Sequence, residues 1–598
     1  MYGSAESTKP LRGQEFFFWL CAVAALFALL GRAAFFGAET RIAEAAREAG
    51  DFGRWWPLCI NFRPFPHLPP LEAWSIAALR LGGGTGEFSG RLPSALAALA
   101  LLGGVRVLAV TLFDRRSALV AGWLTLGCCG VLYLGRCSGS GVLSCALTVW
   151  AVAVYCRSRI AGRRGFWSTL AVGLLLALTA ANGGWSALAV AAALLAPWLY
   201  RHRGAPKPGR WRTWLALLLS AEALYFGCQV FFGDPVTILS ELLKLGFHGD
   251  FSGVWSLVKD LYGPRSDPPW AGFYNLPRVV LPWVLIGCAA VAAAVCRYRT
   301  LSPDERALLK GCVGTFVMLG LLPGTTWPDY LVLVPFLALG SAIELLGDHA
   351  ARWTLRSVTV TRWVIVLAAA LATVSPVALP MWKQLLGFEL PNVLLAAGPL
   401  AGVLVLTVML FDSHPAQPFS RLSGLPRTMT STILGGTLMT ICLISFLIPP
   451  LRELRAEKPF LLKLHSETKG LEPGAFVYLG GESAASVLLF YTRMPGEITV
   501  IDGVGEDLDK ASSLLARAVA AAPGAPLAIV TRCRPGRELK FLRDCVKAGI
   551  VRIDVDEPTF REEIPPGGGA PDRRLACWLI NSPHGKFSSS THVQNKGN

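Results

Sequence analysis

Long apolar stretches recur along almost the whole chain and constrain its fold more than any other feature. A helix needs about 20 apolar residues to cross the hydrocarbon core of a bilayer. A composition of 53% hydrophobic and 16% charged residues over 598 residues is also too apolar for a soluble protein. We therefore predict a polytopic α-helical membrane protein with about 13 transmembrane helices, which start near residues 14, 89, 116, 140, 166, 184, 212, 276, 306, 329, 361, 387 and 428.

Clusters of Lys and Arg occupy every second connection between these apolar stretches. Cytoplasmic loops of membrane proteins carry an excess of positive charge, so the alternation predicts which side each loop faces. It places the N-terminus in the cytoplasm and the C-terminal tail outside. The net charge of +16 is then mostly orientation charge, and nucleic acid is not an expected partner.

The chain changes character near residue 452, where short β-rich runs begin to alternate with amphipathic stretches. Alternation of this kind favours a small α/β domain. We expect a transmembrane domain over 1–451, with outer loops at 37–88 and 233–275, an extracytoplasmic α/β domain over 452–582 and a disordered tail over 583–598. Strands are predicted at 476–480, 498–502, 527–531, 551–555 and 575–580, and helices near residues 483, 507 and 537.

The first outer loop carries three motifs in a fixed order. They are Ala38-Glu39-Thr40-Arg41-Ile42-Ala43-Glu44, His67-Leu68-Pro69-Pro70-Leu71 and Glu87-Phe88-Ser89-Gly90-Arg91-Leu92-Pro93-Ser94. This order resembles the first outer loop of GT-C glycosyltransferases, in the branch of lipid A aminoarabinose transferase and protein O-mannosyltransferase. The resemblance implies a GT-C fold and an enzyme of the bacterial inner membrane. Its reaction would move a sugar from a polyprenyl-phosphate carrier to a lipid, glycan or protein acceptor at the outer face.

Several charged positions of the family pattern are replaced in this chain. The two expected aspartates are Ala38 and Gly141, and two expected lysines are Leu68 and Thr326. The retained residues, such as Arg91 and its neighbours, are scaffold residues in this interpretation. Two hypotheses stay open: a transferase with altered chemistry, or a catalytically silent homologue that binds lipid-linked sugar or serves as a partner subunit. A transporter ranks last, because the spans contain few intramembrane charges.

Sugar transfer needs a carboxylate that activates the acceptor and cations that hold the departing phosphate. Glu39 is the candidate catalytic carboxylate, although it is equally explained as a structural partner of Arg41. For substrate binding the candidates are Arg41, Arg136, Arg265 and Asp329.

Each candidate for substrate binding or nearby charge also has a plainer explanation. Arg136 is equally explained as an arginine at the membrane interface, and Asp329 as a charge at a helix N-terminus. Glu44 and Arg47 are expected to be ordinary interfacial helix charges. Apart from membrane lipids, the expected partners are the lipid-linked sugar and its acceptor.

A divalent metal is the one cofactor that the resemblance suggests. His67 in the first outer loop and His248 in the long outer loop are the candidate ligands. Two histidines without a spacing motif resemble no established metal-binding pattern, so the prediction rests on the family alone.

Overall fold

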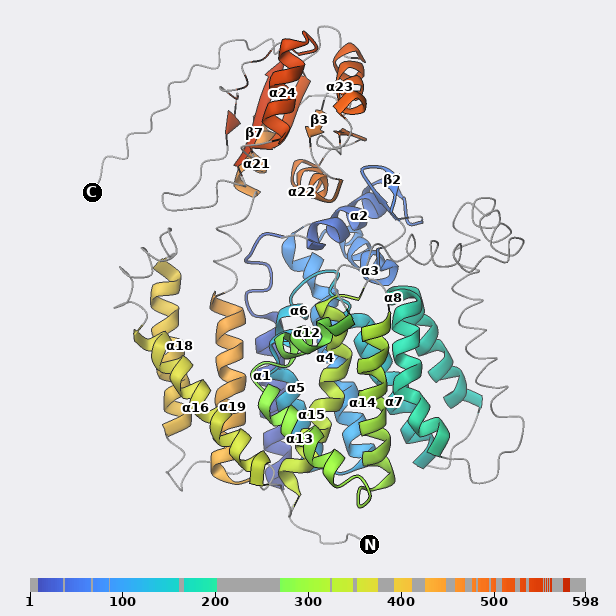
Figure 1. Ribbon diagram of the computed structural model, residues 1–598, viewed down its shortest axis with the longest axis vertical. Helices are drawn as coiled ribbons and strands as arrows, with labels where there is room; N and C mark the ends of the chain where they lie inside the picture. Colours follow the sequence, from blue (N-terminus) through green and yellow to red (C-terminus); the bar gives the residue numbers. More distant parts are fainter. Residues whose placement is uncertain are drawn as a thin grey trace.

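The computed structural model is a bundle of helices with a small sheet at one end (Figure 1). It describes residues 9–201, 269–374, 392–410, 425–447 and 458–580. His67, His248 and Arg265 lie outside the described residues. The described ranges have gaps at 36–37, 57, 66–67, 85, 161–165, 323–324, 348–351, 468–475, 480–481, 494–495, 502–507, 522–526, 534–536, 552, 554, 556–557, 559 and 562–573.

The described part of the bundle consists of α-helices of 6 to 36 residues and a few short 3-10 and π segments. The short segments are η1 (Pro269–Ala271), η2 (Trp327–Leu333) and η4 (Leu443–Leu447). The α-helices are α1 (Lys9–Phe27), α4 (Glu87–Leu112), α5 (Arg115–Leu126), α6 (Cys129–Leu134), α7 (Val142–Ile160), α8 (Phe166–Arg201), α12 (Gly272–Val280), α13 (Val284–Cys296), α14 (Pro303–Leu321), α15 (Val334–Leu346), α16 (Arg352–Val374), α18 (Asn392–Leu410) and α19 (Arg427–Cys442).

Five stretches among the described residues are long and apolar enough to cross a membrane, and the bent pair α12 and α13 would make a sixth. The chain is therefore an integral membrane protein. The spans predicted to start near 166 and 184 form the two apolar halves of the single helix α8, and the span predicted near 212 lies outside the described residues. The number of 13 spans stays a prediction. The five stretches are Glu87–Leu112, Val142–Ile160, Trp327–Leu346, Arg352–Val374 and Arg427–Ser445.

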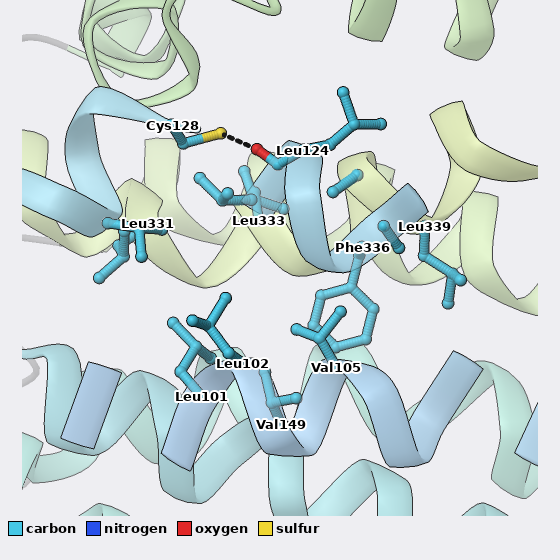
Figure 2. Close-up of a cluster of buried hydrophobic side chains, with 14 of the residues drawn as sticks. Leu101, Leu102, Val105, Leu124, Cys128, Val149, Leu331, Leu333, Phe336 and Leu339 are labelled. Carbon is cyan, nitrogen blue, oxygen red and sulfur yellow. Dashed lines mark hydrogen bonds between the residues drawn. The ribbon is translucent and has the colours of Figure 1, made fainter. Parts of the chain in front are cut away.

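The core of the bundle lies around α4, which contacts α7 on one side and α15 on another. Figure 2 shows Leu102 and Val105 of α4 facing Phe336 of α15. A Cβ at Gly104 would lie 3.1 Å from Val149 Cγ1. Glycine at this position therefore allows α4 and α7 to approach closely, as small residues do between membrane helices.

The C-terminal part forms a five-stranded mixed sheet with the order β4-β3-β5-β7-β6. β3 pairs in parallel with β4 and β5, whereas β7 pairs antiparallel with β5 and β6. The strands are β3 (Phe476–Leu479), β4 (Thr499–Ile501), β5 (Leu527–Cys533), β6 (Phe560–Arg561) and β7 (Arg574–Ile580), and the helices are α21 (Lys458–Glu467), α22 (Glu482–Thr492), α23 (Leu508–Ala521) and α24 (Arg537–Lys547).

Most of the strands in this part correspond to sequence predictions. Those expected near 476, 498, 527 and 575 are present as β3, β4, β5 and β7. The described residues of 551–555 form no strand, so that prediction was wrong for them. β6 was not predicted, because two residues are too short to show a period of alternation.

The sheet shares a hydrophobic core with the first outer loop. That loop contains α2 (Ala38–Phe52), the hairpin of β1 (Cys59–Ile60) and β2 (Arg63–Pro64), and α3 (Pro70–Leu81), which lie between the bundle and the sheet (Figure 1). Buried residues of α2 and α3 belong to the same cluster as buried residues of α21, α22 and one face of the sheet. The other face of the sheet packs against α23 and α24 in a separate cluster. The outer loop and the sheet are thus packed as one unit, while the predicted boundaries at 451 and 582 stay predictions.

Candidate functional site

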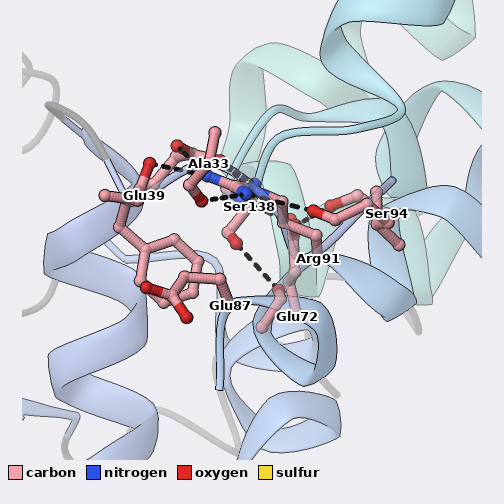
Figure 3. Close-up of polar contacts among 12 residues, drawn as sticks. Ala33, Glu39, Glu72, Glu87, Arg91, Ser94 and Ser138 are labelled. Carbon is pink, nitrogen blue, oxygen red and sulfur yellow. Dashed lines mark hydrogen bonds and ion pairs between the residues drawn. The ribbon is translucent and has the colours of Figure 1, made fainter. Parts of the chain in front are cut away.

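The guanidinium of Arg91 on α4 is buried and binds oxygens from two other segments (Figure 3). Its Nε and Nη2 donate to the two carboxylate oxygens of Glu39 at 2.9 and 3.1 Å. Nη1 donates to the carbonyls of Leu30 and Ala33 at 3.1 and 2.7 Å, and Nη2 to that of Ala34 at 3.0 Å. This planar fork holds both the segment after α1 and the first turn of α2 against α4.

Glu39 is a buried carboxylate with an exposed fraction of 4%. The sequence offered Arg41 as its structural partner, and that was wrong, because Glu39 binds Arg91. Arg41 is half-buried and makes no hydrogen bond or ion pair to any other described residue. A catalytic role of Glu39 stays a prediction, and the structure shows that any such role would be combined with a structural one.

Glu72 on α3 is a second buried carboxyl group, and it is not among the candidates predicted from the sequence. Its exposed fraction is 1%. Oε1 accepts hydrogen bonds from the Ser94 hydroxyl and from the Gly139 amide, the latter at 2.7 Å. Oε2 is buried without a hydrogen-bond partner among the described residues. The sequence does contain a signal for this residue. Glu72 is an acidic residue in the first turn of an apolar helix, and it directly follows Pro69-Pro70-Leu71.

Burial raises the pKa of Glu72, and the nearby negative charge of Glu39 raises it further. The hydrogen bonds from Ser94 and Gly139 oppose this shift, but they act on one oxygen only. The two carboxyl groups of the site therefore lie in different electrostatic surroundings. Glu39 is matched by a guanidinium, whereas burial favours the protonated form of Glu72.

Both carboxyl groups bind the loop between α6 and α7, which carries the second missing aspartate at Gly141. Glu39 accepts a hydrogen bond from the Ser138 amide at 3.1 Å, next to the Gly139 amide that Glu72 binds. Gly139 and Gly141 have positive φ angles of 70° and 74°, which favour glycine. A Cβ at Gly141 would meet no described atom within 4 Å. The position of the missing aspartate is thus next to open space.

Arg136 and Asp329 both make contacts that stabilise local structure. Arg136 is 7% exposed and donates to the carbonyls of Ala25 and Ala28 at 2.6 and 2.7 Å, at the C-terminal end of α1. Asp329 accepts hydrogen bonds from the amide and the hydroxyl of Thr326 at 2.7 and 3.1 Å, which caps η2. Their roles in substrate binding stay predictions.

Glu44 and Arg47 of α2 form a buried ion pair and are not the interfacial charges that the sequence suggested. Their side chains are 0% and 2% exposed, and Arg47 Nη2 lies 2.7 Å from Glu44 Oε1. The expectation failed because α3 and α22 both pack against α2. Glu48, one turn further on, is also buried and accepts hydrogen bonds from the Phe62 amide at 3.1 Å. Burial and the charge of Glu44 raise the pKa of Glu48 to about 7.

We predict that this shift makes the protein less stable as the pH rises. The folded state binds a proton at Glu48 with a pKa of about 7, against an ordinary value of 4.5. The stabilisation is therefore complete below about pH 4.5 and is lost as the pH rises through 7, by at most about 3 kcal/mol. Glu48→Gln should remove this loss, which thermal unfolding in nanodiscs at pH 5 and pH 8 would measure. Glu497→Gln, at an exposed position, is the control, and an equal pH dependence in wild type and Glu48→Gln would contradict the prediction.

No group of three or more metal-binding side chains occurs among the described residues. His67 and His248 both lie outside them. The prediction of a divalent metal therefore stays a prediction.

Comparison with solved structures identifies the class of fold. The chain has the GT-C fold of membrane glycosyltransferases. ArnT from Cupriavidus metallidurans bound to undecaprenyl phosphate aligns with a TM-score of 0.65 at 15% identity, over 96% of this chain and 98% of that chain. Apo ArnT aligns with a TM-score of 0.62 at 16% identity, over 95% and 98% of the two chains. No family model and no curated protein matches the sequence.

Proposed function

We propose that the protein is a glycosyltransferase that takes a sugar from a polyprenyl-phosphate carrier. The acceptor is a lipid, a glycan or a protein at the outer face of a bacterial inner membrane. The observation that carries this proposal is the agreement in fold, along almost the whole of both chains, with ArnT bound to undecaprenyl phosphate. The position of the first outer loop between the bundle and the sheet supports it.

This function requires a cation for the carrier phosphate, and Arg41 is the candidate that the structure leaves available. It is half-buried on α2 and makes no hydrogen bond or ion pair to any other described residue. Arg265, in the predicted long outer loop, is a second candidate. Arg136 and Asp329 would have to bind substrate in addition to their present contacts.

We predict that Arg41→Gln weakens carrier binding by at least about tenfold, because a hydrogen bond to a charged group contributes about 1.5–3 kcal/mol. Arg32→Gln is the matched control, since Arg32 is an exposed arginine just after α1. Binding of polyprenyl phosphate to each variant in nanodiscs would be measured by native mass spectrometry. Equal affinities of the two variants would rule out Arg41 as the phosphate ligand.

A catalytically silent homologue is the second candidate function, and one observation favours it. Glu39, the carboxylate retained from the family motif, has both oxygens bound to Arg91. The neighbouring position Ala38 and the second acidic position Gly141 carry no carboxylate. Such a protein would still bind the lipid-linked sugar, or serve as a subunit of an active transferase.

An active transferase should turn over its substrates, whereas a catalytically silent homologue should not. The purified protein in nanodiscs would be incubated with a pool of polyprenyl-phosphate sugars and a membrane acceptor extract. Mass spectrometry would follow release of free carrier and the mass of the acceptor. Sugar-dependent release supports the transferase, whereas binding of the lipid-linked sugar without release supports the silent homologue.

A further inference from the structure

Glu72 lies beside the backbone where the family pattern expects an aspartate. Its Oε1 accepts a hydrogen bond from the Gly139 amide, two residues before Gly141. The Glu72 amide in turn donates to Asn182 Oδ1 on α8 at 3.3 Å. Ser94 of α4 and the Gly139 amide therefore fix the carboxyl group, while Asn182 of α8 holds the backbone of Glu72.

The two oxygens of Glu72 differ in their surroundings. Oε1 has two donors, whereas Oε2 has no partner among the described residues. A buried polar atom without a hydrogen bond destabilises the fold, and an apolar side chain at this position would avoid that loss. The Ser140 hydroxyl, in the adjacent loop, is buried without a described partner as well. Each of these two atoms can therefore still form a hydrogen bond to a polar group that reaches it.

The charges around Glu72 leave it without a cation of its own. Glu39 on α2 contributes a negative charge, and Arg91 on α4 directs its guanidinium to Glu39 and three carbonyls. Glu72 makes no ion pair with any described residue. Burial and the charge of Glu39 raise the pKa of Glu72, so its carboxyl group binds a proton more tightly than an ordinary glutamate does.

We propose that Glu72 Oε2 is the proton acceptor of sugar transfer and replaces the aspartates missing at Ala38 and Gly141. The inference rests on the proposed transferase function. The acceptor hydroxyl gives its proton to Oε2 while its oxygen forms a bond to the anomeric carbon of the sugar. The bond from that carbon to the phosphate oxygen breaks, and its electron pair leaves with the polyprenyl phosphate. Water then takes the proton from Glu72.

Access to Glu72 requires a movement, because its side chain is only 1% exposed. The 138–141 loop has glycines with positive φ on both sides of the buried Ser140, and Gly141 is exposed with open space where a Cβ would be. The proposal therefore includes a displacement of this loop, whose Gly139 amide binds the carboxyl group. Loop movements of this kind commonly precede chemistry in enzymes.

The test is Glu72→Gln in the nanodisc assay. The glutamine oxygen can still accept the hydrogen bonds from Ser94 and Gly139, but its amide cannot take up a proton. We expect turnover to fall by about 10²–10⁴-fold, with the melting temperature and the carrier affinity almost unchanged. Ser94→Ala is the control, because it removes one donor to Oε1 and keeps the carboxyl group. It should lose far less turnover than Glu72→Gln, since the carboxyl group can still take up a proton.

The pH profile gives a second readout that does not depend on how the variant folds. In the wild type, kcat/KM should fall as the pH drops through the pKa of Glu72, because the protonated carboxyl cannot accept a proton. The residual rate of Glu72→Gln should lack this decline. A wild type without the acidic decline, or a Glu72→Gln variant with wild-type turnover, would overturn the inference alone. A wild type that binds carrier without any turnover would overturn the proposed function, and this inference with it.

Discussion

Arg91→Met is expected to lower the free energy of unfolding by about 3–5 kcal/mol, because it breaks a buried ion pair from one side. Glu39 would remain as a buried charge without its guanidinium. The carbonyls of Leu30, Ala33 and Ala34 would lose their donor in the same step. Thermal unfolding of the protein in nanodiscs measures the loss.

A surface pair of the same chemistry provides the control. Arg63 and Glu497 form an ion pair at 2.8 Å, with side chains 54% and 48% exposed. Arg63→Met should therefore cost less than about 1 kcal/mol. Combining Arg91→Met with Glu39→Gln should recover part of the loss, since the uncompensated charge disappears. If Arg91→Met were no more destabilising than Arg63→Met, the Arg91 interactions would not stabilise the fold as argued.

The same interactions affect how activity measurements are interpreted. Glu39→Gln weakens the contact that holds α2 and the Ser138 amide, so loss of turnover in that variant has two explanations. Glu72→Gln keeps its hydrogen bonds and changes the proton-accepting group alone. A loss of turnover in Glu72→Gln is therefore easier to assign to the chemical step than a loss of turnover in Glu39→Gln.

Features encoded locally could be predicted from the sequence. Apolar stretches predicted membrane helices such as α4 and α7, and alternating runs predicted four of the five strands in the C-terminal sheet. The motif around Arg91 predicts a scaffold role, and the hydrogen bonds of Arg91 and Ser94 hold separate segments of the chain together.

Long-range contacts account for what the sequence did not reveal. The partner of Glu39 is 52 residues away, and the loop bound by Glu72 is 67 residues further along the chain. α2 has the charge pattern of a solvent-exposed helix, yet it is buried because α22, more than 400 residues later, packs against it. Neither the spacing of charges nor helix periodicity contains this information.

Leu489→Ala is expected to loosen the first outer loop as well as the sheet. Leu489 on α22 is fully buried in the cluster that includes Ile42 and Ala46 of α2. Such a truncation costs about 2–5 kcal/mol. Because 1.4 kcal/mol corresponds to about a factor of ten in an equilibrium, amides of α2 should exchange hydrogen at least about tenfold faster.

Leu515→Ala is the matched control for this coupling. Leu515 on α23 is equally buried, but it belongs to the cluster on the opposite face of the sheet. The substitution should destabilise that face by a similar amount and leave exchange in α2 almost unchanged. If both substitutions increased hydrogen exchange in α2 equally, the idea that α22 specifically links α2 to the sheet would be contradicted. The expected difference would show that α22 supports α2, which carries Glu39 and Arg41, so that the geometry of the candidate site depends on the C-terminal part of the chain.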